Sequence, residues 1–149
     1  MPLTDFLDKA SQDAVVAAIV AAEHLTSGEI RVHVEPRLPR SCRGNAVRRA
    51  VEVFGALGME KTRLRNGVLV YVAYRSRHLA IVGDKGINER VPAGFWDEEL
   101  RELVGSLSRG KAAEGLCHAI ASIGERLKAY FPAAEDDENE QSDEISYSE

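Results

Sequence analysis

Apolar residues recur at helical spacing along four stretches of the chain. Ser11, a good N-cap, precedes the first stretch, which stops before Gly28. The second stretch includes Val47 and Val51 in its expected buried stripe, and the last ends at Pro132, which cannot continue a helix. The pattern therefore predicts four helices. Their apolar stripes lie within residues 15–22, 47–57, 96–107 and 116–130.

Three other segments have the pattern of β-strands. Residues 29–35 alternate strictly between apolar and polar, which predicts a strand with one face in water. Residues 66–74 are apolar almost throughout, as is typical of a strand covered by helices on both faces. A short polar link leads to residues 78–83, so these two strands should form an antiparallel hairpin. The element order is αβαββαα, and we predict an α/β fold, a three-layer α/β/α sandwich around a small mixed sheet.

The charge is divided unevenly along the chain. The formal net charge is -5, but residues 133–149 contain eight acidic and no basic residues, so the rest is mildly basic. We predict a domain at residues 1–132 and an acidic flexible C-terminal tail at 133–149, because so polar a segment buries too little to offset its ordering entropy. Ile145 and Tyr147 alternate within that tail, and the alternative is that they add a strand to an exposed sheet edge or dock on the arginine-rich edge of this or another molecule.

The sequence shows no sign of export or membrane insertion. The first residues lack a basic segment followed by an apolar one, and the longest apolar run is too short to cross a bilayer. Cys42 and Cys117 match no paired-ligand spacing, so neither a disulfide framework nor a zinc site is indicated. We expect a cytoplasmic protein.

Polar residues from three parts of the chain should meet at one edge of the sheet. A right-handed crossover makes the first two strands parallel, so Asp84, after the third strand, lies near the starts of the others at Glu29 and Asn66. Oxygen ligands favour Ca²⁺ or Mg²⁺, and we expect Asp84, Asn66, Asn88 and Glu29 to hold such a cation. Glu29 and Asp84 would be roughly 10 Å apart, so a curved loop would be needed. The alternative is that Asp84 merely caps a turn before Gly86.

The opposite edge is rich in arginine. Arg37, Arg40 and Arg43 follow the first strand, and Arg75 and Arg77 follow the second. Crevices at the carboxyl ends of parallel strands often bind ligands, and guanidinium groups suit phosphate or carboxylate. We therefore expect these five arginines to bind an anion. Nucleic acid is the weaker alternative, because no aromatic residues alternate with the arginines and the whole chain is acidic.

Two segments of the chain stand out, "TSGEIRVHVE" and "NGVLVYVAYRSRHLAIVGDKGI", the second with Asn66–Leu69, Arg77 and Gly83. With these motifs and this order of segments, residues 3–132 or so resemble the TPM-domain family. That family includes plant thylakoid-lumen proteins linked to photosystem II repair and many bacterial proteins of unknown role. The resemblance implies an α/β/α sandwich. Some plant members are described as acid phosphatases and some members as binding divalent cations, but many carry a signal or anchor, which we do not expect in this chain.

Three functions follow as hypotheses. The first is a binding or regulatory module that uses a divalent cation and an unknown protein partner, which the acidic tail could contact. The second is a weak metal-assisted phosphoesterase, which rests on the resemblance because no catalytic constellation is visible in the sequence. The third is a nucleic-acid-binding protein that uses the arginine edge.

Overall fold

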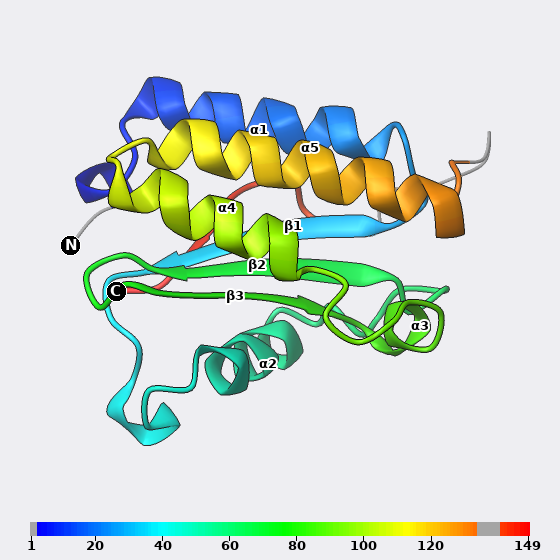
Figure 1. Ribbon diagram of the computed structural model, residues 1–149, viewed down its shortest axis with the longest axis horizontal. Coiled ribbons are helices and arrows are strands. Elements are labelled where there is room, and N and C mark those ends of the chain that lie inside the picture. Colours follow the sequence, from blue (N-terminus) through cyan, green and yellow to red (C-terminus); the bar gives the residue numbers. More distant parts are fainter. Residues whose placement is uncertain (1–2, 134–140) are drawn as a thin grey trace.

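The computed structural model describes residues 3–133 and 141–149 of the chain (Figure 1). One mixed sheet lies between two layers of helices, so the predicted α/β/α sandwich is confirmed. The strands are β1 (Glu29–Glu35), β2 (Gly67–Ala73), β3 (His78–Gly83) and β4 (Ser146–Tyr147). The helices are η1 (Leu3–Asp5), α1 (Lys9–Glu23), η2 (Arg40–Cys42), α2 (Ala46–Ala56), α3 (Lys85–Asn88), α4 (Asp97–Ser108) and α5 (Ala112–Tyr130).

The sheet has the strand order β3-β2-β1-β4. β1 and β2 are parallel, with Glu29 opposite Gly67, and β2 and β3 are antiparallel, with Val68 opposite Gly83. The predicted strand directions are therefore confirmed. As a result, the carboxyl ends of β1 and β2 and the turn between β2 and β3 share one edge of the sheet, while Asp84 lies at the other.

The two faces of the sheet are covered by different helices. Figure 1 shows α1, α4 and α5 on one side and α2 on the other. β2 is buried along its whole length, as its continuous apolar run predicted. The first face packs valines of β1 and β2 beneath α1 and α5, whereas the second packs Leu69, Tyr71 and Ala73 against Ala50 and Val53 of α2.

The prediction that β1 has one face in water is wrong. Its polar residues Glu29, His33 and Glu35 are only 2%, 3% and 4% exposed. They are covered because α2 and the C-terminal segment lie over the face of β1 that alternation had assigned to solvent. The polar residues of β1 therefore face a buried polar cluster and not the solvent.

Two helices also differ from prediction. α1 begins at Lys9, and its N-cap is Asp8, whose side chain accepts a hydrogen bond from the Ser11 backbone N–H at 2.8 Å. Val47 and Val51, predicted to be buried, are 54% and 58% exposed. Because α2 meets the sheet through Ala50 and Val53, the two valines on its neighbouring face are turned outward.

The C-terminal segment returns to the sheet. β4 pairs with β1 in parallel, and the Ser148 N–H donates to the Val34 carbonyl at 3.0 Å. β4 therefore forms in the segment where the alternation of Ile145 and Tyr147 suggested a strand. Residues 134–140 of the predicted flexible tail lie outside the described residues. Within the described ranges, no helix is long and apolar enough to cross a membrane.

Candidate functional site

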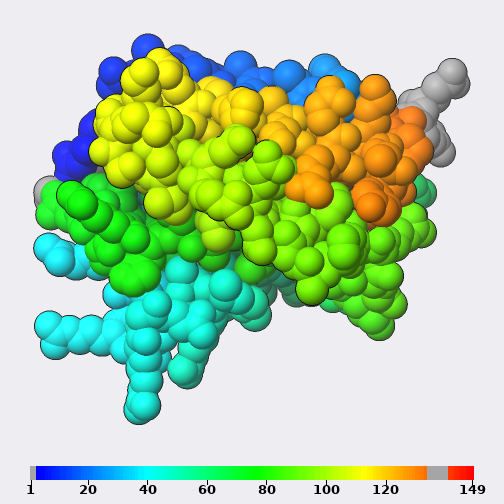
Figure 2. All heavy atoms as spheres, viewed as in Figure 1, coloured from blue at the N-terminus to red at the C-terminus, as the bar shows by residue number. Residues whose placement is uncertain are grey.

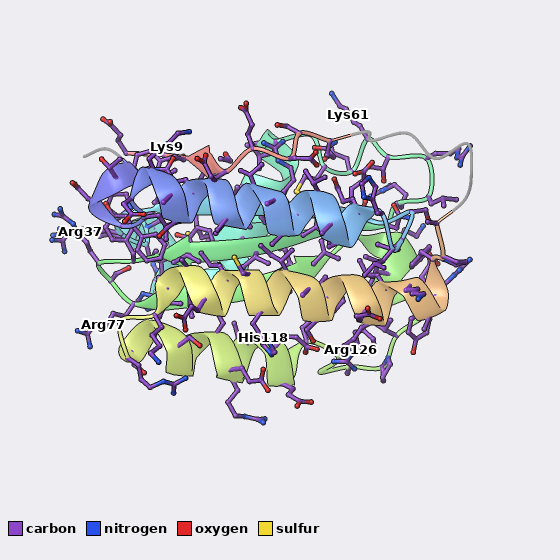
Figure 3. All side chains as sticks on the ribbon, turned by 90° about the horizontal axis from the view of Figure 1, so that it is seen from above. Lys9, Arg37, Lys61, Arg77, His118 and Arg126 are labelled. Carbon is purple, nitrogen blue, oxygen red and sulfur yellow. The ribbon has the colours of Figure 1, made fainter. Side chains whose placement is uncertain are left out.

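The five arginines of the predicted anion site lie at one end of the molecule, and we call them the arginine rim. The short helix η2 and its flanks carry Arg37, Arg40 and Arg43, all exposed, and the β2–β3 turn carries Arg75 and Arg77. Figure 3 shows Arg37 and Arg77 extending outward at the same end, and Figure 2 shows side chains of the cyan segment between β1 and α2 projecting from the body.

The rim arginines differ from several arginines elsewhere, which have acidic partners. Arg49 pairs with Glu35, Arg65 with Asp84 and Arg126 with Glu99. On the rim, only Arg75 has a carboxylate within reach among the described residues, at 3.7 Å from Asp5. Arg37, Arg40, Arg43 and Arg77 are exposed and have no acidic partner in the part of the chain that the structure describes.

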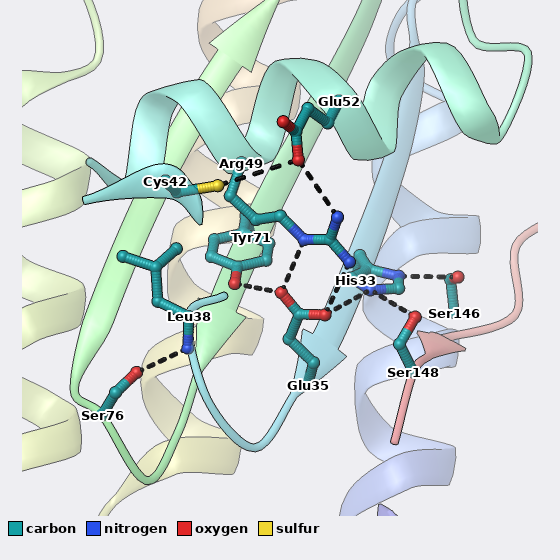
Figure 4. Close-up of polar contacts among 10 residues, drawn as sticks. All are labelled: His33, Glu35, Leu38, Cys42, Arg49, Glu52, Tyr71, Ser76, Ser146 and Ser148. Atoms are coloured by element: carbon teal, nitrogen blue, oxygen red, sulfur yellow. Dashed lines mark hydrogen bonds and ion pairs between the residues drawn. The ribbon is translucent and has the colours of Figure 1, made fainter. Parts of the chain in front are cut away.

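A buried polar network lies directly beneath the rim, between β1, β2 and α2 (Figure 4). Glu35, the last residue of β1, accepts two hydrogen bonds from Arg49, from Nε at 2.8 Å and from Nη2 at 2.9 Å. The hydroxyl of Tyr71 donates to the same carboxylate. This bidentate geometry is the strongest form of a carboxylate–guanidinium contact, so Glu35 fixes α2 against the sheet.

The network holds its members in fixed protonation states. Burial would raise the pKa of Glu35, but hydrogen bonds from His33, Arg49 and Tyr71 and the charge of Arg49 together lower it to about 2. Burial and the Glu35 carboxylate raise the pKa of Tyr71 above its ordinary value. At neutral pH Glu35 is therefore ionised and Tyr71 is protonated.

His33 connects this network to the C-terminal segment. Its Nδ1 lies 2.8 Å from Ser146 Oγ, and its Nε2 lies 3.1 Å from Ser148 Oγ and 3.9 Å from Glu35. The ring also stacks on Tyr71, with centroids 6.2 Å apart. One buried imidazole thus holds two hydroxyl groups of β4 and its neighbour, and it orders the part of the chain that pairs with β1.

The residues of the predicted cation site lie at the opposite edge, where each of them contacts other residues of the chain. Asp84 forms hydrogen bonds with Arg65 Nε at 2.8 Å and Nη2 at 3.0 Å, and it caps α3 through the Lys85 N–H at 2.7 Å. Asn88 donates to the Gly83 carbonyl at 3.0 Å. Asn66 donates to Ser27 at 3.4 Å, while its Oδ1 is buried without a hydrogen-bond partner among the described residues.

Glu29 belongs to a different cluster. Burial, together with hydrogen bonds to Asp143 and Glu29, raises the pKa of Glu23 well above its ordinary value. Glu23 therefore carries a proton at neutral pH and accepts from the Ile30 N–H at 3.2 Å. In the described residues, no group of three His, Cys, Asp or Glu side chains is arranged to hold a metal ion.

Gly86 explains the shape of the turn after Asp84. A Cβ at this position would collide with the backbone carbonyl oxygens of Leu64 and Arg65, and the Gly86 N–H donates to the latter at 2.8 Å. The turn is therefore built to pack on the segment that precedes β2. This packing agrees with the capping alternative for Asp84.

Sequence reasoning missed the network of Glu35, Arg49 and Tyr71. The only signal was an acidic residue at the end of a strand, followed along the chain by several arginines. Nothing in the spacing singled out Arg49 from Arg48, and Tyr71 lay within an apolar run.

Comparisons with known proteins were consistent with this architecture. The model of one family, described as "TPM domain", matches residues 2–126. Among solved structures, the chain is similar to the NMR structure of the BA42 protein from the psychrophilic bacterium Bizionia argentinensis, with 39% identity, 99% of each chain covered and a TM-score of 0.88. No curated protein matches the chain significantly.

Proposed function

The chain belongs to the TPM-domain family, and on that premise we propose that it works as a binding module whose arginine rim recognises an acidic segment of a partner protein. The observation that carries this proposal is the exposure of Arg37, Arg40, Arg43 and Arg77 without acidic partners among the described residues. Guanidinium groups bind carboxylates in a bidentate manner, so a run of Asp or Glu is a fitting ligand.

The buried network supports a binding role. Glu35 and Arg49 fix α2 to the end of β1, and the segment that carries Arg37, Arg40 and Arg43 runs between those two elements. A rim anchored at both ends loses little freedom when a ligand binds, which favours affinity. The ionised Glu35 and protonated Tyr71 beneath it suit electrostatic support better than acid–base catalysis.

The test is a calorimetric titration with a ten-residue polyglutamate peptide. We expect binding that weakens as salt is added, and at least tenfold weaker binding by the triple variant Arg37→Glu, Arg40→Glu, Arg43→Glu. The matched control is the triple variant Arg101→Glu, Lys128→Glu, Lys61→Glu, which makes the same charge change at exposed positions outside the rim. Equal losses in both triple variants, or no binding by the wild type, would contradict the proposal.

The other two functions are separated by simple assays. A phosphoesterase would release phosphate from p-nitrophenyl phosphate in the presence of Mg²⁺ or Ca²⁺, and a nucleic-acid-binding protein would bind an oligonucleotide with a steep logarithmic salt dependence. We expect neither turnover nor oligonucleotide binding tighter than that of polyglutamate. Turnover, or tight oligonucleotide binding, would favour the corresponding alternative.

We further propose that Asp84, Asn66, Asn88 and Glu29 contribute oxygen ligands to Ca²⁺ or Mg²⁺. The buried Oδ1 of Asn66, which has no hydrogen-bond partner among the described residues, supports a cation at this edge. Arg65 holds the Asp84 carboxylate in its place, and Glu29 contacts Glu23, so binding requires both contacts to open. Arg65→Gln should therefore tighten Ca²⁺ binding and Asp84→Ala should abolish it, as measured by calorimetry. Unchanged affinity in both variants would contradict this site.

A further inference from the structure

A pocket lies beside the arginine rim, where four segments of the chain meet. It has a volume of about 550 Å³, within the range of small-molecule sites. Its walls come from the N-terminal segment, the β2–β3 hairpin, the end of α4 and the start of α5, which lie together at one end of the molecule (Figure 1). The residues that line it include Phe6, Tyr74, Leu79, Val104, Leu107 and Ala112.

The walls of the pocket are largely apolar. Phe6 stacks on Tyr74 with ring centroids 4.9 Å apart, and the pair forms one side. Val104 of α4 lines another side although this residue is 50% exposed. An exposed aliphatic residue next to aromatic rings indicates that an apolar ligand would bind here favourably, because binding would remove apolar surface from water.

The mouth of the pocket is positively charged. Arg77 lines it, and no acidic residue does so among the residues that the structure describes. Figure 3 shows Arg77 beside the connection between α4 and α5. Ala112, the first residue of α5, also lines the pocket, and Lys111 before it provides no side-chain cap for that helix. The guanidinium group and the positive end of the α5 dipole therefore both favour an anion.

From this combination we propose that the pocket binds a small amphiphilic carboxylate, with the hydrocarbon chain or ring against Tyr74, Val104 and Leu107 and the carboxylate at Arg77. An anion without an apolar body would leave the walls in water, and an apolar cation would be repelled at the mouth. The ligand is a small molecule, unlike the acidic protein segment of the proposed function. The two sites share Arg77, but the pocket does not depend on Arg37, Arg40 or Arg43.

The backbone at Arg77 allows a test variant that removes the charge without strain. Its φ is +59°, in the left-handed region that glycine adopts readily. Arg77→Gly should therefore remove the charge without loss of stability, which a thermal unfolding experiment can verify. Arg77→Lys retains the charge and serves as the matched control.

The experiment is a titration of the isotopically labelled full chain with decanoate, followed by NMR. We expect saturable shifts at Leu79, Val104 and Ala112, no saturation with decylamine or acetate, and about tenfold weaker binding by Arg77→Gly. Val104→Gln should weaken decanoate binding and leave polyglutamate binding intact because it adds no charge beside Arg77, whereas the Arg37, Arg40, Arg43 triple variant should show the reverse. Equal binding of decanoate and decylamine, shifts centred elsewhere, or full affinity in both Arg77→Gly and Val104→Gln would overturn the proposal.

Discussion

Replacing Glu35 by glutamine should destabilise the protein by an amount that depends strongly on pH. Glu35 is 4% exposed, and its carboxylate accepts hydrogen bonds from Arg49 and Tyr71. A glutamine side chain at this position would keep the size and one acceptor but lose the charge that faces the guanidinium. Arg49 would then remain without this buried counter-charge beneath α2.

The magnitude follows from the pKa of this carboxyl group. The folded state lowers it from 4.5 to about 2, and each pKa unit corresponds to about 1.4 kcal/mol, so Glu35 should contribute about 3 kcal/mol at pH 7. Because the folded pKa is depressed, that contribution is fully present above the unfolded value and is lost as pH falls through the folded value. About 1.5 kcal/mol should remain at pH 3, and almost nothing below pH 2.

Urea denaturation at pH 7 and at pH 3 measures this difference directly. The wild type should exceed Glu35→Gln by about 3 kcal/mol at pH 7 and by about half of that at pH 3. The control is Glu52→Gln, which changes the exposed second partner of Arg49 and should cost less than about 0.5 kcal/mol at either pH. If the cost of Glu35→Gln were the same at both pH values, the assigned charge state of Glu35 would be wrong.

Three further substitutions, one of them with a matched control, test other parts of the structure by urea denaturation. The pKa of Glu23 is raised in the folded state, so the contribution of Glu23 to stability falls as pH rises above its unfolded value of about 4.5. Glutamine resembles the protonated form, so Glu23→Gln should stabilise the protein at pH 7 by on the order of 1 kcal/mol. Gly86→Ala should cost about 2 kcal/mol or more because its Cβ meets backbone oxygens, whereas Gly55→Ala, in open space on α2, should stabilise slightly. Arg126→Met should cost about 3 kcal/mol by leaving the buried Glu99 carboxylate without its counter-charge, although Ser122 still donates to it. An opposite sign in any of the three would refute its local argument.

The strand directions could be predicted from sequence because they follow from local rules. The apolar run at residues 66–74 required cover on both faces, and the link at 75–77 was too short for anything but a hairpin. Together with the right-handed crossover that makes the first two strands parallel, the hairpin predicts that Arg37 and Arg77 lie at one end and Asp84 at the other. The structure has that arrangement.

The contacts of the polar residues could not be predicted in the same way. Alternation showed that His33 and Glu35 share a face of β1, but it could not distinguish water from a polar interior. The residues that cover them are Arg49 of α2, Tyr71 in the middle of β2, and Ser146, which is 113 positions from His33 along the chain. The partner of Asp84 could not be predicted either, because its contact with Arg65 depends on the packing of Gly86 against the loop before β2.

The position of β4 in the chain has a consequence for synthesis on the ribosome. β1 emerges early, but the strand that pairs with its outer edge is translated more than a hundred residues later. A nascent chain that has completed α5 can therefore assemble β1, β2 and β3 with their helices while one edge of the sheet stays open. Unpaired strand edges can pair with neighbouring chains, so the chain is more prone to aggregate during this interval than after β4 has formed. Messages truncated before codon 146 should yield polypeptides that aggregate or are degraded.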